Sequence, residues 1–148
     1  MDALNNWYIR RSRDRFWREE KDADKQAAYD TLYTVLSNLC RVAAPFLPFV
    51  TEKIYRGLTG EKSIHLADWP DAKALPEERD LVAAMDLVRE VCSATLSIRE
   101  KENLRVRLPL SELIVASENA GALERFKSLI REEVNVKELT LSDDLASY

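Results

Sequence analysis

The chain has few of the residues that make tight turns, metal sites or cross-links: of its 148 residues, three are glycine, two are cysteine and one is histidine. The scarcity of glycine, together with 46% hydrophobic and 32% charged residues, is typical of a compact helix-rich protein and excludes collagen-like and disordered chains. Cys40 and Cys92 lie in periodic apolar stretches without CxxC spacing, which predicts reduced core thiols. One histidine and two isolated cysteines predict no zinc or di-iron site.

Long hydrophobic runs are also missing. The longest run, residues 42–50, is interrupted by Pro45 and Pro48 and is too short to cross a bilayer. The N-terminus is polar and unlike a signal peptide. We therefore expect a cytoplasmic protein with no membrane partner.

The small net charge conceals an uneven distribution. Residues 7–18 hold five arginines against one aspartate, a local charge of +4, so the net charge of -4 leaves -8 for the rest of the chain. A polyanion that binds this chain must therefore find a local basic element, because the protein as a whole is acidic.

The first part of the chain predicts a helical bundle. A helix is expected from Leu4 to about Glu20; since no capping residue precedes it, we expect the chain to begin mid-helix, as a piece of a longer polypeptide. Asp24 is a candidate cap for a second helix whose apolar side covers more than half of its circumference, as in a helix enclosed by others.

A third helix is expected to begin at Pro48 and to end at Gly57 or Gly60. Its predicted buried side is formed by Phe49, Val50, Ile54, Tyr55 and Leu58. The following loop, residues 59–75, is expected to pack over the bundle, with Trp69 filling its surface, and a fourth helix is expected over residues 76–101.

The pattern changes after residue 103. Alternating apolar residues predict strands over 104–110, 113–116 and 136–141, with a helix over 120–133 between them. Residues 142–148 complete no further element, which again suggests a cut. We predict a mainly α protein with two domains, a helical bundle over 1–102 and a small α/β subdomain over 103–148.

Candidates for binding nucleic acid lie in the first predicted helix: Arg10, Arg11, Arg13, Arg15 and Trp17. On a helical wheel the arginines occupy two faces, with Arg10 and Arg13 on the less apolar one. A guanidinium donates two parallel hydrogen bonds to phosphate, and an aromatic ring can stack on an unpaired base. RNA is therefore a natural partner for this helix.

Other interpretations of the charged residues remain open. Three pairs at i,i+4 spacing can neutralise each other on a solvated surface: Arg10 with Asp14, Asp14 with Arg18, and Arg15 with Glu19. A second basic run is a candidate for tRNA backbone contacts or for simple solubilising charge: Lys101, Arg105 and Arg107. No nucleophile and base can be paired, so no catalytic residue is predicted.

Four sequence blocks resemble one known family. Residues 4–17, LNNWYIRRSRDRFW, resemble the helix that opens the second half of the anticodon-binding domain in isoleucyl-tRNA synthetases. Residues 44–55, APFLPFVTEKIY, resemble a signature shared by the isoleucyl, valyl, leucyl and methionyl enzymes of class Ia. Two later blocks follow in the family's order: SIHLADWP at 63–70, and IREK with LRVRLPL at 98–110.

The resemblance implies an anticodon-binding region that recognises the anticodon arm of isoleucine-accepting tRNA. The parent enzyme would ligate isoleucine to that tRNA with ATP and magnesium, and this region would adjoin its catalytic domain. The ATP-binding signatures of the family, His-Ile-Gly-His and Lys-Met-Ser-Lys-Ser, are not in this sequence, so we expect the piece to be inactive alone and to need no cofactor. The alternatives are a valyl-type enzyme or a helical module that binds protein rather than RNA.

Overall fold

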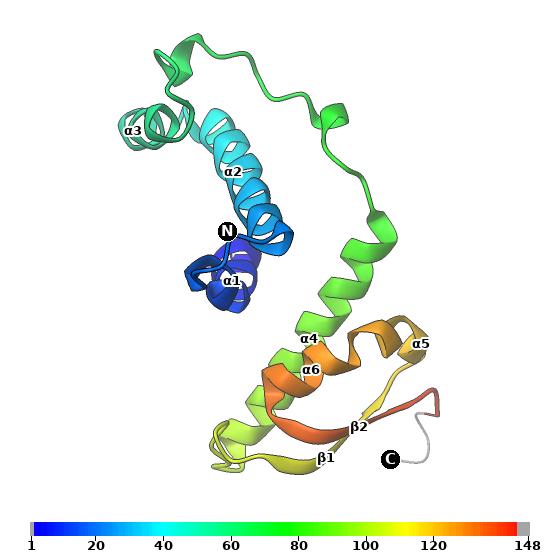
Figure 1. Cartoon of the computed structure of the whole chain (residues 1–148). Helices are drawn as coiled ribbons and strands as arrows, with labels where there is room; N and C mark the ends of the chain where they lie inside the picture. The colour runs from blue at the N-terminus through cyan, green and yellow to red at the C-terminus, as the bar shows by residue number, and fades with distance from the viewer. Residues whose placement is uncertain (1, 145–148) are drawn as a thin grey trace. The chain divides into compact units, whose positions relative to one another are not determined.

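A computed structural model describes residues 2–144 and contains two compact units that divide between Leu75 and Pro76 (Figure 1). The first unit contains η1 (Ala3–Ile9), α1 (Arg13–Trp17), α2 (Ala23–Ala43), α3 (Pro48–Thr59), η2 (Ile64–Leu66) and η3 (Ala72–Ala74). The second contains α4 (Arg79–Lys101), β1 (Leu110–Ala116), α5 (Ala120–Leu123), η4 (Glu124–Phe126), α6 (Lys127–Val134) and β2 (Val136–Ser142). The predicted class, mainly α with a small α/β part, is confirmed.

The division between the units differs from the boundary expected at residue 102. The fourth helix, α4, packs on α5 and α6 and so belongs with the α/β part. Its buried positions recur at helical spacing along one face: Ala84, Val88, Cys92, Thr95 and Arg99. Sequence periodicity identified this helix but not the element against which it packs.

The first helical segment is less regular than predicted. Its opening turns form a π-helix, the backbone turns at the buried Ser12, and α1 ends at Trp17 instead of Glu20. Arg18 adopts an extended backbone, and its guanidinium Nη1 donates to Asp22 at 2.6 Å. This contact bends the chain towards the start of α2.

The cap of α2 is Asp22, so the expectation for Asp24 is wrong. The Asp22 carboxylate accepts a hydrogen bond from the backbone N–H of Lys25 at 2.7 Å, and chiefly for this reason its pKa is lowered. Within its unit α2 packs against α1 and α3, while Tyr29 and Tyr33 remain nearly half exposed. This one-sided packing is contrary to the predicted enclosure of the helix.

The junction of α2, α3 and the following loop forms a small core. Cys40, Ala44, Tyr55 and Ile64 are buried together, which confirms that the loop packs on the helices. Burial raises the pKa of the Cys40 thiol, and both cysteines are free and buried as expected. Trp69, however, is 67% exposed, so its predicted role in filling the bundle surface is wrong.

The start of α3 at Pro48 is confirmed, and Gly60 ends the helix with a φ of 74°. The predicted buried side is confirmed at Tyr55, which is 3% exposed, and is wrong at the other four positions: Phe49, Val50, Ile54 and Leu58 are exposed. Thr51, which was not predicted, is buried. Two residues subtend about 200° on a helix, so Phe49 lies opposite the face that carries Thr51. The first apolar residue after a proline is a poor guide to the buried face.

The second unit holds a parallel strand pair, in which Leu110 lies opposite Val136 and Ala116 opposite Ser142. The connection between the strands is helical, as parallel pairing requires, and α6 contacts both α4 and β2. The expected helix over 120–133 is divided into α5, η4 and α6. The expected tail over 142–148 lies largely outside the described residues.

The predicted strand over 104–110 is wrong except at its last residue. Residues 104–109 are irregular and include one turn, closed by a hydrogen bond from the N–H of Leu108 to the carbonyl of Arg105 at 2.9 Å. Arg99, only 1% exposed, binds three carbonyl oxygens through its side chain: those of Arg105 and Leu108 at 2.6 Å and that of Val134 at 3.2 Å. The buried guanidinium thus takes up carbonyl groups that a strand would pair with a neighbouring strand.

Glu52 joins α3 to the loop that follows it. Its Oε2 accepts hydrogen bonds from the backbone N–H of Ile64 at 2.8 Å and from the hydroxyl of Ser63 at 3.0 Å. The Ile64 bond is the main reason that the pKa of Glu52 lies below its ordinary value of 4.5.

We predict that Glu52→Gln removes an acid-sensitive part of the stability. Since the folded pKa lies below the unfolded one, the ionised group stabilises the fold above the unfolded pKa, and this contribution is lost as the pH falls through the folded pKa. The urea midpoint of the variant should therefore lie below that of the wild type at about pH 7 and converge with it under acid conditions. Glu61→Gln, at an exposed position, is the control; an unchanging gap across pH would contradict the prediction.

We also predict that Arg99→Met lowers the free energy of unfolding by about 3 kcal/mol, because three carbonyl groups lose their donor in or near the core. Urea denaturation at neutral pH measures the change. Arg79→Met is the matched control, since Arg79 is exposed and pairs with the exposed carboxylate of Glu77. Equal unfolding midpoints for the two variants would show that the Arg99 contacts contribute little.

Candidate nucleic-acid interface

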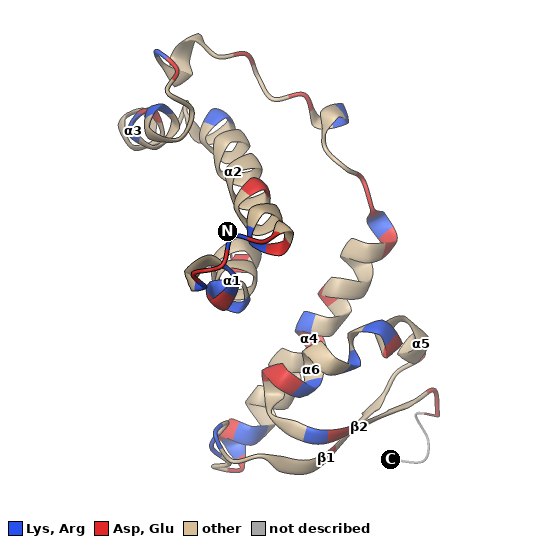
Figure 2. Ribbon diagram, viewed as in Figure 1, with Lys and Arg blue, Asp and Glu red and all other residues tan. Residues whose placement is uncertain are grey.

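Positive charge is concentrated at two places that the sequence had marked. Figure 2 shows basic residues on the first helical segment and, separately, where α4 ends and the next turn begins. The candidates at these places are Arg10, Arg11, Arg13, Arg15 and Trp17 in the first unit, and Lys101, Arg105 and Arg107 in the second.

In the first segment, Arg15 is held by α2. Its Nε donates to the Asp24 carboxylate at 3.0 Å and its Nη2 to the Asp24 backbone carbonyl at 2.9 Å. Arg18 is held in a similar way by Asp22. Both pairs join the first segment to the start of α2, and neither is one of the three pairs considered from the sequence, although Arg18–Asp22 also has i,i+4 spacing. Two of the arginines therefore dock the segment onto α2.

Arg11 has a second kind of partner. It is half-buried, and its guanidinium carbon lies 5.5 Å from the centroid of the Trp7 ring, a cation–π arrangement. Trp7 and Arg11 therefore lie together on one side of the segment.

The remaining candidates of the segment face solvent. Arg10 and Arg13 are exposed, although the Nε of Arg10 donates to the backbone carbonyl of Asn6 at 2.9 Å. Trp17 is 82% exposed at the end of α1. An exposed indole close in sequence to exposed guanidinium groups combines a stacking surface with phosphate-binding groups.

In the second unit, Lys101, Arg105 and Arg107 are all exposed. Lys101 is the last residue of α4, and Arg105 and Arg107 lie in the turn that follows. The Arg99 side chain binds two backbone carbonyl groups of this turn. Arg99 was not identified from the sequence as a functional or structural residue. The available signal was its spacing: it lies four residues after Thr95 and seven after Cys92, so a charged residue occupies the core-facing stripe of α4.

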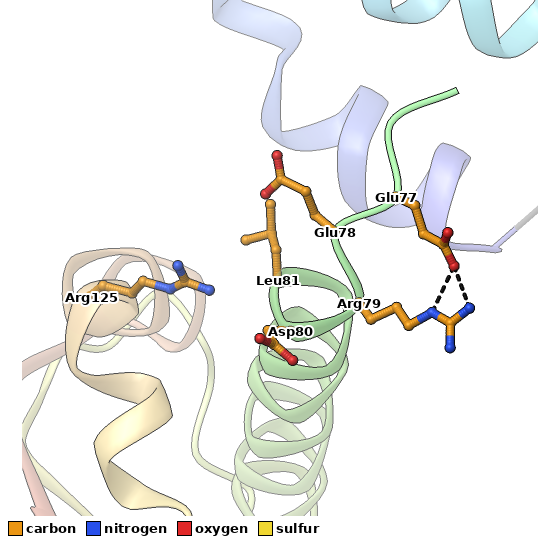
Figure 3. A pocket seen from close by; sticks show the side chains of 6 residues that line it. All are labelled: Glu77, Glu78, Arg79, Asp80, Leu81 and Arg125. Atoms are coloured by element: carbon orange, nitrogen blue, oxygen red, sulfur yellow. Dashed lines mark hydrogen bonds and ion pairs between the residues drawn. The ribbon is translucent and has the colours of Figure 1, made fainter. Parts of the chain in front are cut away.

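A hollow at the start of α4 has the wrong charge for a polyanion (Figure 3). Its lining residues are Glu77, Glu78, Arg79, Asp80, Leu81 and Arg125. Three carboxylates face two guanidinium groups, and Arg79 is already bound to Glu77 at 2.6 Å. Phosphate would meet net repulsion here, so this hollow is not the interface.

Within residues 2–144, no three histidine, cysteine or acidic side chains lie close enough together to hold a metal ion. None of the helices in the described part of the chain is long and apolar enough to span a bilayer.

Comparison with known proteins identifies the domain type. A family profile described as "Anticodon-binding domain of tRNA ligase" matches residues 1–114. Isoleucine–tRNA ligase of Mycobacterium tuberculosis is 56% identical over 147 residues, which is 99% of this chain and 14% of that protein. The enzymes with the same name from Nocardia farcinica and Corynebacterium efficiens are 53% and 56% identical, over 99% and 97% of this chain and 14% of each relative.

The chain therefore spans about one-seventh of the length of these relatives. The family resemblance of the four sequence blocks is confirmed by a match that includes the arginine-rich segment and extends through the turn after α4. The chain belongs to the family of anticodon-binding domains of tRNA ligases, and the relatives named above are isoleucine–tRNA ligases.

Proposed function

We propose that this domain binds the anticodon arm of isoleucine-accepting tRNA within a longer isoleucine–tRNA ligase. The relatives that carry this name support the choice of tRNA. The ligation itself, with ATP and magnesium, belongs to a catalytic region of the parent enzyme and takes place in the cytoplasm. This domain needs no cofactor for its part.

The observation that carries the proposal is the division of the arginines in the first segment. Arg15 is bound to α2 by Asp24, which fixes the segment on the unit, while the side chains of Arg10 and Arg13 are exposed to solvent, with the Nε of Arg10 on the Asn6 carbonyl. Arg11 stays beside Trp7 and adds positive charge at the edge of this surface. Guanidinium groups presented by a docked helix suit the ribose–phosphate backbone, whose charge dominates the affinity of most RNA contacts.

Trp17 offers a stacking contact with a base, which phosphate binding alone does not provide. The anticodon loop contains unpaired bases, and an indole that is 82% exposed can stack on one of them without first leaving a core. Binding of the arm by this domain would place the distant acceptor end at the catalytic domain of the parent chain. The energy of remote contacts then serves to orient the reacting end.

We predict that Arg10→Ala combined with Arg13→Ala weakens binding to isoleucine tRNA and to an unrelated tRNA alike, because phosphate contacts carry no sequence information. The slope of log affinity against log salt should fall by about 0.7 for each lost contact with single-stranded RNA. Filter binding with the 148-residue chain across a salt series measures both effects.

The matched control is Lys62→Ala with Lys73→Ala, which removes two exposed positive charges from the same unit. Equal effects of the two double variants would show that Arg10 and Arg13 contribute only general positive charge and no specific contact. Absence of affinity for any tRNA even at low salt would contradict the proposal and favour the alternative of a protein-docking module. Isoleucine tRNA, valine tRNA and an unrelated tRNA compared side by side test the choice of partner.

A further inference from the structure

The turn after α4 is held rigid by side chains from two helices. At the end of α4, Asn103 takes a left-handed φ of 57°, the N–H of Leu104 donates to the Arg99 carbonyl at 2.8 Å, and the N–H of Asn103 donates to the Glu100 carbonyl at 3.1 Å. This is the Schellman pattern of helix termination. Arg99 therefore takes part twice, with its carbonyl ending the helix and its side chain binding the turn that follows.

Side chains of Arg99 and Asn135 bind the backbone carbonyl groups of the residues that follow. The Arg99 guanidinium donates to the carbonyl oxygens of Arg105 and Leu108, and the side-chain amide of Asn135, at the end of α6, donates to that of Val106 at 2.8 Å. Three of the carbonyl groups in residues 104–109 thus point towards buried or half-buried donors. Their partial negative charge is directed away from the exposed cations.

The cations themselves are available. The side chains of Lys101, Arg105 and Arg107 are exposed, and among the described residues they form no hydrogen bond or ion pair. Two acidic neighbours in the same stretch, Glu100 and Glu102, are also exposed, so the exposed charge of residues 100–107 is three positive against two negative, or +1. Arg99 adds a further positive charge that has carbonyl partners but no carboxylate.

We propose that this turn is a second, preformed binding element for the RNA backbone, in which Arg105 and Arg107 contact phosphate and Arg99 is a positioning residue. The inference rests on the proposed function and assigns it a second surface, in the other compact unit. A fixed backbone lowers the ordering cost of binding, because only the outer side chains must be immobilised when phosphate arrives. An arginine that grips three carbonyl groups serves this purpose better than an apolar residue, which would leave the turn without donors.

The first arm of the test replaces the contacting groups and leaves the turn intact. Arg105→Ala with Arg107→Ala keeps the carbonyl of Arg105 as an acceptor for Arg99. At about 0.1 M salt we expect binding of an isoleucine tRNA transcript to weaken about 25-fold and the salt slope to fall by about 1.4, for two lost contacts. Glu102→Gln should tighten binding about twofold by removing a repulsive charge. Lys53→Ala with Lys73→Ala is the control for lost charge.

The second arm tests positioning. Asn135→Gly suits the left-handed backbone at this position, φ 53°, and removes only the bond to Val106; Arg99→Lys retains the charge and loses the planar fork. Measured well below their unfolding midpoints, both should weaken tRNA binding in the wild-type background and have no further effect when Arg105 and Arg107 are already alanine. If Arg99→Lys does not fold, Asn135→Gly carries this arm alone.

The outcomes separate the two proposals. Unchanged affinity and salt slope in the Arg105 and Arg107 double variant, with weaker binding in the Arg10 and Arg13 double variant, would overturn the second surface and leave the proposed function standing. Positioning variants that lower stability but not tRNA affinity, or whose effects add to those of the double variant, would reduce Arg99 to a structural role. Absence of all tRNA binding by the wild-type chain would overturn both proposals.

Discussion

The second unit depends on one buried charge. Arg99 is nearly inaccessible to solvent, and its partners in the described structure are carbonyl oxygens from the turn after α4 and from the end of α6. Burying a guanidinium is costly unless its donors are used, and here its Nε remains without a partner. The compensation is that the end of α4, the irregular turn and the last turn of α6 are tied at one point, from which β1 and β2 then run in parallel.

The parts of the fold that could be predicted are those set by local chemistry. Proline and glycine placed both ends of α3, and apolar periodicity located α2, α4 and most of β2. The predictions of secondary structure and burial failed where residues distant in sequence determine the local structure. Alternation over 104–108 is typical of a strand, but a strand needs a neighbour for its carbonyl groups, and Arg99 had already taken two of them. Apolar spacing placed Phe49 on the buried side of α3, whereas the rotation of the helix places Thr51 inward.

The sequence predicted which residues are candidates for binding, but not which of their side chains are held by other groups of the protein. Arginine density marked the first segment, and the sequence even separated Arg10 and Arg13 from the more apolar face. Which arginine is bound within the protein depends on Asp24, whose position on a neighbouring helix no spacing rule within the first segment supplies. For the same reason, a lone arginine in an apolar stripe gave no indication of its three carbonyl partners, which lie 6, 9 and 35 residues away in sequence.

The link between the two units has its own consequence. Residues 71–80 are all exposed, and the units on either side hold separate sets of contacts. Under the two proposals above, each unit carries one RNA-binding surface, and the chain would act as a bivalent ligand. Once one surface has engaged a strand of RNA, the tether confines the other to a small volume around it, where its effective concentration is in the millimolar range for a short linker. Two individually weak grips can then give a long residence time without any added contact, and the length of the link becomes a variable on which avidity depends.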